Sequence, residues 1–301
     1  SRDGAIALSD CVPVFERMGL FVEFETGYPV RPAEKPVADA PDEYWIHSLS
    51  MRQADGVSLD LEQVGPAFED AFVAVWGGAA ENDGFNALVF NAKLRWREAA
   101  LCRALCAYRH QSGLDPARST QIEALNANPD LTGHLMALFQ ARFDPDFDGD
   151  RETVCASLQK QILESLKAVP SLDHDRIIRR LDDLIMAIQR TNFFQRDPQG
   201  APHPFISFKV ASRELDDLPD PKPYREIFID SPQVEGVHCR FGPVARGGLR
   251  WSDRRDDFRT EVLGLVKAQQ VRNAVLVPVG SRHCRVQDFH QQPARPNRQS
   301  D

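Results

Sequence analysis

The stretch FISFKVASRELDDLPDPKPYREIFIDSPQVEGVHCRF, residues 205–241, contains three short runs typical of β-strands. The runs FISFKV, YREIFID and VEGVHCRF are rich in β-branched and aromatic residues, and turns containing Pro, Asp or Gly separate them. Beyond them, the pattern predicts a helix from about Arg259 to Asn273 and a buried strand over AVLVPVG, residues 274–280. A sheet with a helix leading into an apolar strand predicts α/β architecture.

Upstream of these strands the chain is predicted to be helical. Helical patterns cover residues 61–76, 85–110, 129–142, 151–168 and 172–192. The last pattern repeats large apolar residues at helical spacing, which predicts a face that packs in a core. Those residues are Ile177, Leu181, Leu184, Ile185 and Ile188. The composition changes at QRDPQGAPHP, residues 195–204, and we place a domain boundary there.

The two ends of the chain differ from this pattern. Residues 8–19 predict an amphipathic helix, and residues 20–30 and 45–53 alternate apolar and polar side chains as half-buried strands do. Helix, strand and strand predict part of a small α+β module. Residues 281–301 contain only two large apolar side chains and predict disorder, because so little surface could be buried there.

Composition and charge narrow the class of protein. The 301 residues carry a net charge of −8, with an acidic balance of −14 over residues 1–239 and a basic balance of +6 over residues 240–301. An acidic body does not favour nucleic-acid binding, which needs a broad cationic face. No run approaches the roughly 18 apolar residues of a membrane helix. Six cysteines without a CxxC pair predict buried thiols in a reducing cytosol, and no metal-ligand motif is present.

The block GPVARGGLRWSDRR, residues 242–255, gathers cations beside two adjacent glycines. A phosphate loop is not supported, because GxxxxGK[ST] and GxGxxG are both missing. A single RGG in a strand-to-helix segment is also no RNA-binding repeat. The third interpretation is a carboxylate site, in which glycines let a ligand approach the backbone and arginine supplies a bidentate fork.

Pairing with nearby acids is the competing explanation for most of these cations. We expect it for four arginines on a solvated surface, with Asp253, Asp256, Asp257 and Glu261 as partners; these arginines are Arg250, Arg254, Arg255 and Arg259. Local pairing does not explain two others. Arg246 has no acid within six residues, and Arg272 has none within ten. Gln269 is three residues before Arg272 and therefore shares its helical face.

Four long blocks of the sequence resemble the large bacterial NAD-specific glutamate dehydrogenases. They are WGGAAENDGFNALVFNAKLRWREAALCRA, DHDRIIRRLDDLIMAIQRTNFFQ, FISFKVASRELDDLPDPKPYREIFIDSPQVEGVH and GPVARGGLRWSDRRDDFRTEVLGLVKAQQVRNAVLVPVG. The resemblance covers about residues 8 to 280. It implies oxidative deamination of L-glutamate to 2-oxoglutarate and ammonia, with NAD as cofactor, in a cytoplasmic enzyme whose full-length form we expect to be a homo-oligomer.

The resemblance also implies a division of the chain. Residues 1–55 resemble the end of an ACT-like module, residues 56–195 a helical region, and residues 196–280 the beginning of the catalytic, substrate-binding domain; residues 281–301 form a disordered tail foreign to the family. The expected fold class is therefore α+β to α/β multidomain. It comprises an ACT-like α+β remnant, a helical middle region and the start of an α/β substrate-binding domain.

The resemblance assigns substrate-binding roles to the unpaired cations and their neighbours. The family has a lysine before a Gly-Gly pair that holds one carboxylate, and Arg246 stands there before Gly247 and Gly248. A glutamine and a lysine on the next helix hold the other carboxylate, and Gln269 and Arg272 match them, with arginine replacing lysine. Two separated cations suit glutamate, which has two carboxylates.

The sequence departs from the family just after Gly280. Arg282 stands where the family has its catalytic lysine, and the following glycines are missing. Arginine stays protonated, whereas the base needs a reversible pKa, so no catalytic residue is intact. No dinucleotide fingerprint occurs either. We expect a truncated, inactive piece whose NAD-binding domain is absent. The alternative is a non-catalytic amino-acid-binding, regulatory or assembly protein.

Overall fold

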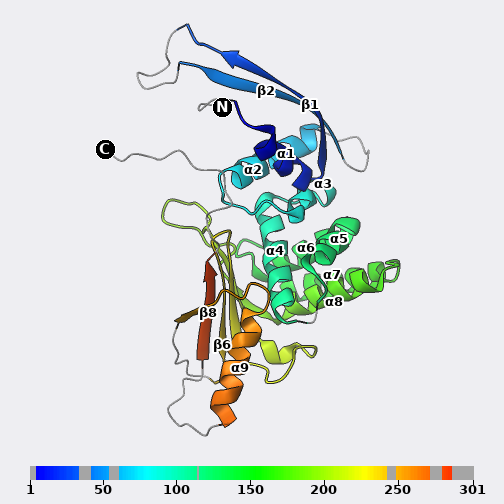
Figure 1. Ribbon diagram of the computed structural model, residues 1–301. Helices are drawn as coiled ribbons and strands as arrows, with labels where there is room; N and C mark the ends of the chain where they lie inside the picture. The colour runs from blue at the N-terminus through cyan, green and yellow to red at the C-terminus, as the bar shows by residue number, and fades with distance from the viewer. Residues whose placement is uncertain are drawn as a thin grey trace.

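The computed structural model describes residues 5–33, 42–53, 61–113, 115–242, 249–271 and 280–286. Within them, a small N-terminal unit precedes a larger unit of helices and one sheet (Figure 1). The protein is thus a mixed α+β chain with more than one domain, as expected. None of the described helices is both long enough and apolar enough to cross a bilayer.

The N-terminal unit packs two main helices against a hairpin. It consists of α1 (Leu8–Arg17), β1 (Leu20–Val30), β2 (Tyr44–Gln53), α2 (Leu61–Trp76) and α3 (Leu88–Asn91). The predicted helix and both strands are confirmed, and β1 pairs antiparallel with β2. Gly19 joins α1 to β1 with φ of 85°, a left-handed conformation that favours glycine. The rings of Phe15 and Phe72 stack 5.1 Å apart and join α1 to α2.

The larger unit begins with a set of packed helices. They are α4 (Trp96–Gln111), α5 (Arg118–Ala127), α6 (Pro129–Phe143), α7 (Arg151–Leu166) and α8 (Leu172–Ala187). The sequence did not predict α5. The single helix predicted over residues 85–110 is wrong, because the short 3₁₀ helix Gly84–Ala87, α3 and α4 divide it. Lys93 takes φ of 53° in the break between α3 and α4, which no continuous right-handed helix allows.

The sheet follows the helices and has six strands in the described part of the chain. They are β3 (Ile188–Thr191), β4 (Ile206–Val210), β5 (Arg225–Asp230), β6 (Val234–Arg240), β7 (Leu249–Trp251) and β8 (Gly280–Val286). Their order is β3-β4-β5-β6-β8-β7, and every pair is antiparallel except β7 with β8. The three strands predicted over residues 205–241 are confirmed. The parallel pair β7 and β8, with α9 (Phe258–Val271) between them in sequence, is the α/β element of the fold.

Two segments differ from their predicted secondary structure. The helix predicted over residues 172–192 ends at Ala187, and β3 begins at Ile188, whose backbone is extended. Ile188 is buried opposite Val210 of β4, so a buried apolar residue at this position agrees with the helical pattern as well as with a strand. The predicted strand over residues 274–280 lies outside the described residues except for Gly280. Residues 281–286, expected to be disordered, form β8 instead.

Helices and sheet share one core. Tyr108 of α4 is fully buried and meets Phe208 of β4 and Phe228 of β5 edge-on, with ring centroids 5.9 and 5.6 Å apart. Phe258 and Val262 of α9 are buried in the same cluster. Figure 1 shows α4 standing beside the sheet, with α9 running along β8. The helix α9 therefore packs in the core that α4 shares with strands β4 and β5.

Candidate functional site

The residues expected to bind substrate fall mostly outside the described part of the chain. Arg246, Gly247, Gly248 and Arg272 lie outside it altogether. Gln269 lies in the last part of α9, residues 267–271, of which the structure describes the backbone only. Arg282, expected to stand at the place of the family's catalytic lysine, lies in β8, also described by its backbone only. The strands and the helix that flank these residues are described.

Those elements meet at one end of the sheet. Arg240, at the end of β6, pairs with Gly280 at the start of β8. Leu249, at the start of β7, pairs with Arg282 only two residues further along β8. The segment 243–248 therefore has both of its neighbouring strands at the end of the sheet where β8 begins. Figure 1 shows the C-terminal end of α9 at the same end.

A buried ion pair fixes the other end of α9. Arg259, in the first turn of α9, donates from Nε and Nη2 to the two carboxylate oxygens of Glu226 at 2.8 and 2.7 Å, and both side chains are fully buried. Burial would lower the pKa of Arg259, but Glu226 outweighs burial and raises it above its usual value. The guanidinium therefore stays charged and bound to β5. Its Nη1 has no hydrogen-bond partner in the described structure.

Gln111 at the end of α4 adds a second connection to the start of α9. Its Nε2 donates to the carbonyl of Arg255 at 2.8 Å, and its Oε1 accepts from the backbone N–H of Arg259 at 3.2 Å. The face of Tyr108 lies 6.0 Å from the guanidinium carbon of Arg259. The start of α9 is thus held by side chains from both α4 and β5.

The expectation of local surface pairing is correct for one arginine and wrong for another. Arg254 pairs with Asp257 at the surface, with Nε 2.7 Å from Oδ1. Arg259 instead pairs with Glu226, 33 residues earlier in sequence, and is fully buried. The sequence could not reveal this partner, because acids stand close to Arg259 along the chain. The side chain of Arg250 lies outside the described residues.

Two further buried arginines were not singled out from the sequence. Arg103 of α4 donates to both carboxylate oxygens of Asp83 at 2.8 and 2.7 Å, which fixes the 3₁₀ turn to α4. Arg109 donates to Asp115 at 3.1 Å and pairs with Asp217. The sequence did contain a signal for their burial, since both arginines stand among mostly apolar residues of one helix, α4. These pairs are structural supports.

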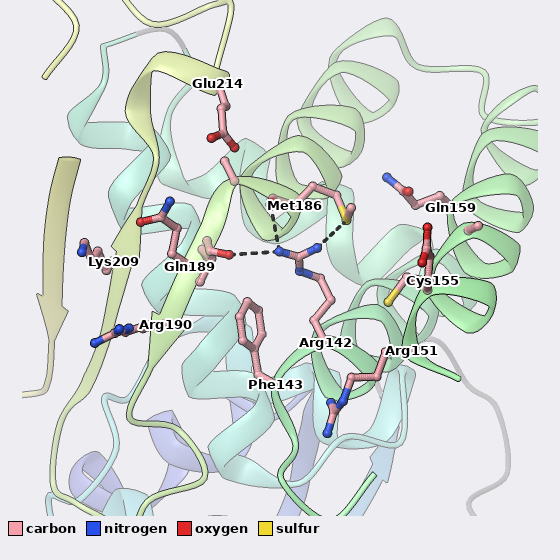
Figure 2. A pocket seen from close by; sticks show the side chains of 14 residues that line it. Arg142, Phe143, Arg151, Cys155, Gln159, Met186, Gln189, Arg190, Lys209 and Glu214 are labelled. Atoms are coloured by element: carbon pink, nitrogen blue, oxygen red, sulfur yellow. Dashed lines mark hydrogen bonds between the residues drawn. The ribbon is translucent and has the colours of Figure 1, made fainter. Parts of the chain in front are cut away.

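The described residues also form a pocket that the sequence did not predict. It has a volume of about 930 Å³ and lies between α6, α7, the end of α8 and strands β3 and β4. Figure 2 shows Arg142 at its centre, with Arg151 on one side and Arg190 and Lys209 on the side of the strands. No three His, Cys, Asp or Glu side chains in the described ranges gather so that they could hold a metal ion.

The cysteine side chains of the described part are poorly accessible. The five cysteines whose side chains are described are free and buried, which confirms the prediction of buried thiols for these five; they are Cys11, Cys102, Cys106, Cys155 and Cys239. Burial raises the pKa of Cys102 to about 12, so its reactive thiolate form is suppressed.

Three family models match consecutive parts of the chain. Residues 1–64 match the ACT3 domain of glutamate dehydrogenase, and residues 80–145 match its helical motif 3. Residues 161–300 match the catalytic domain of bacterial NAD-glutamate dehydrogenase. Relatives named NAD-specific glutamate dehydrogenase are 47% identical over 283 residues in Pseudomonas aeruginosa and 44% identical over 284 residues in Halomonas elongata. The chain belongs to this family.

Family members differ greatly from this chain in length. Each of those two alignments covers 93% of the chain but only 17% of the relative. The Mycobacterium tuberculosis member is 41% identical over 286 residues, with 92% and 17% covered. The chain thus spans about a sixth of the length of these glutamate dehydrogenases, across parts of their ACT3, helical-motif and catalytic regions.

Proposed function

We propose that the chain forms the glutamate-binding part of an NAD-dependent glutamate dehydrogenase, which deaminates L-glutamate oxidatively to 2-oxoglutarate and ammonia. The observation that carries this proposal is the meeting of the end of β6, the start of β7, the end of α9 and the start of β8 at one end of the sheet. The reaction itself is inferred from membership of the family. We also propose cytoplasmic location and a homo-oligomeric full-length enzyme.

The proposed site binds the two carboxylates of the substrate separately. Arg246 would hold one carboxylate, with Gly247 and Gly248 leaving room for it to approach the backbone. Gln269 and Arg272 would hold the other from the last turn of α9 and the residue after it. A five-carbon diacid has its charges at opposite ends, which two separated cations match. Arg259 and Glu226 support this arrangement by fixing α9.

We assign neither the proton transfer nor the hydride acceptor to a residue of this chain. Arg282 keeps its proton and does not serve as the general base. NAD does not fit the β7-α9-β8 unit, because a dinucleotide needs a glycine-rich turn before the helix. The connection from Ser252 to Asp257 has no glycine and three aspartates. We therefore place NAD outside this chain and derive no step through it.

The proposed domains have the bounds that the sequence analysis gives. We propose an ACT-like remnant over residues 1–55, a helical region over 56–195 and the start of the substrate-binding domain over 196–280. The catalytic-domain match extends to residue 300, so we do not propose that residues 281–301 are foreign to the family. Support comes from the order of the three matched family models along the chain.

Calorimetric titration of 2-oxoglutarate into the 301-residue chain tests the proposal. We expect binding that Arg246→Ala weakens roughly tenfold or more, because one charge-assisted contact to a carboxylate is lost. The control is Arg254→Ala, since Arg254 is exposed and pairs with Asp257 on the surface. Binding that responds equally to both substitutions, or is absent altogether, would contradict the proposed site. Binding of L-glutamate independent of Arg246 would favour an amino-acid-binding regulatory protein.

A further inference from the structure

The pocket beside β3 is lined by more cations than anions. Arg142 of α6, Arg151 of α7, Arg190 of β3 and Lys209 of β4 contribute positive charge, and two glutamates, Glu152 and Glu214, are the acids that line it. This excess is unusual for a chain whose first 239 residues carry a balance of −14. The pocket lies at the β3 edge of the sheet, opposite the edge formed by β7.

None of the four cations has a carboxylate partner within salt-bridge distance among the described residues. Arg142 donates to the carbonyls of Met186 and Ile188 at 3.0 and 3.1 Å, and its buried Nε has no partner. Arg151 donates to two carbonyls, those of Ala141 and Asp144, at 2.8 and 2.6 Å. These two arginines are thus held in place by neutral carbonyl groups and not by carboxylates.

The other two cations are direct neighbours across two strands. Arg190 of β3 is paired in register with Lys209 of β4. Like charges directly opposite each other in a sheet repel and destabilise it. Burial lowers the pKa of Lys209, and the nearby Arg190, Arg240 and Arg225 lower it further. A bound anion would relieve this repulsion, since it would place negative charge between the two side chains.

The size of the pocket sets the class of ligand. A volume of about 930 Å³ is large enough for a small organic molecule and much larger than one monovalent ion needs. Arg142 and Arg151 line the helical side of the pocket, whereas Arg190 and Lys209 line the strand side and extend away from Arg142 (Figure 2). Only a ligand with anionic groups at two separated positions would contact both sides. The ring of Phe143 and the side chain of Met186 add apolar surface to the lining of the pocket.

We propose that this pocket binds a small molecule with two or more anionic groups, through Arg142, Arg151, Arg190 and Lys209. Polyphosphates and polycarboxylates share this chemistry. Arg190 and Lys209 contact the ligand directly and hold one of its anionic groups at the strand edge. The site does not depend on the proposed glutamate-binding role, because it uses none of the residues assigned to that role.

Calorimetric titration of the 301-residue chain with pyrophosphate and, separately, with citrate tests the site at low ionic strength. We expect at least one of them to bind, and the tighter of the two identifies the ligand as a polyphosphate or a polycarboxylate. The double substitution Arg190→Gln with Lys209→Gln should weaken binding by roughly tenfold or more, because two charged contacts are lost. Added salt should weaken the binding that remains.

The matched control removes the same charge elsewhere. Arg176→Gln with Lys167→Gln also loses one arginine and one lysine, but both side chains are exposed and paired at the surface, with Asp173 and Glu164. This control should bind as the unaltered chain does, and circular dichroism should show all three proteins folded. Arg246→Ala should also leave this binding unchanged. Equal weakening in both double variants, or no binding of either anion, overturns the proposal.

Discussion

Arg259 of α9 and Glu226 of β5 form a two-point ion pair, 2.8 and 2.7 Å long, in which both side chains are fully buried. The pair connects the first turn of α9 to a central strand of the sheet. It thereby determines where α9 starts, while the opposite end of the helix carries Gln269 to the end of the sheet where β8 begins. A structural ion pair and the proposed substrate site are thus connected by one helix.

Glu226→Gln should destabilise the fold strongly. The substitution leaves the Arg259 guanidinium buried without its counter-charge, and breaking a buried pair in this way costs about 3–5 kcal/mol. Urea unfolding followed by circular dichroism measures the loss of unfolding free energy. Arg254→Gln is the matched control, because it removes an arginine of a surface pair nearby and should leave the unfolding midpoint unchanged.

A double variant separates charge from packing at the same position. Glu226→Leu with Arg259→Met removes both charges and leaves no unpaired group behind, so it should recover much of the stability lost in Glu226→Gln. If Glu226→Gln unfolds at the same urea concentration as the unaltered chain, the pair does not fix α9. The proposed support of the substrate site would then be wrong.

Asp230→Asn should make the chain more stable at alkaline pH. Burial raises the pKa of Asp230 to about 8, with added repulsion from Glu81 and Glu235 and opposing attraction from Arg103 and Arg118. Between the usual pKa of 3.8 and about 8, the folded chain holds a proton that the unfolded chain releases. The unfolding free energy therefore falls as pH rises in this window, by up to ~1.4 kcal/mol per pH unit.

Asparagine has nearly the same shape as aspartate and carries no charge, so this variant should lose that part of the pH slope. Urea unfolding at pH 5, 6, 7 and 8 would show the two curves separating progressively as pH rises. Asp253→Asn is the control, because Asp253 is exposed. Parallel curves for Asp230→Asn and the unaltered chain would show that Asp230 is charged in the folded state at these pH values.

The sequence predicts those parts of the fold whose pattern is local. Strands β4, β5 and β6 follow from alternation within residues 205–241, and α2 has the bounds of the helical pattern over residues 61–76. Ile188 was misassigned because a buried position at the end of a helix looks the same as a buried position at the start of a strand. Only the pairing with Val210 decides between them, and that contact is not local.

The candidate site shows the same limit. Nothing near Glu226 in sequence indicates that it would bind Arg259, and acids close to Arg259 suggested other partners. The cationic pocket could not be predicted either, since its residues come from α6, α7, β3 and β4. In contrast, Arg246 and Arg272 were identified by the lack of acids around them, and their binding roles stay predictions.

Phe228→Ala should weaken the helices and the sheet together. Phe228 is fully buried, with its ring 5.6 Å from both Tyr108 of α4 and Phe208 of β4. Removing such a ring costs about 3–5 kcal/mol. Amide hydrogen exchange should accelerate in α4 as well as in β4 and β5, because all three share the core. Phe205→Ala is the control, since Phe205 is 39% exposed and should have little effect. Acceleration confined to the strands would contradict a shared core.

Arg272 offers the most direct test of the proposed dicarboxylate site, because the resemblance to the family implies lysine at this position. Arg272→Ala should weaken 2-oxoglutarate binding roughly tenfold or more, since a charged contact to one carboxylate is lost. Arg272→Lys should retain part of the affinity, because it keeps the charge but replaces a flat two-pronged donor with a point charge. Calorimetric titration of the unaltered chain and the two variants gives the order of their affinities directly.

Gln269→Ala should lower the affinity less than Arg272→Ala, because a neutral hydrogen bond contributes less than a charged one. If Arg272→Ala binds as tightly as the unaltered chain, the second carboxylate is held elsewhere.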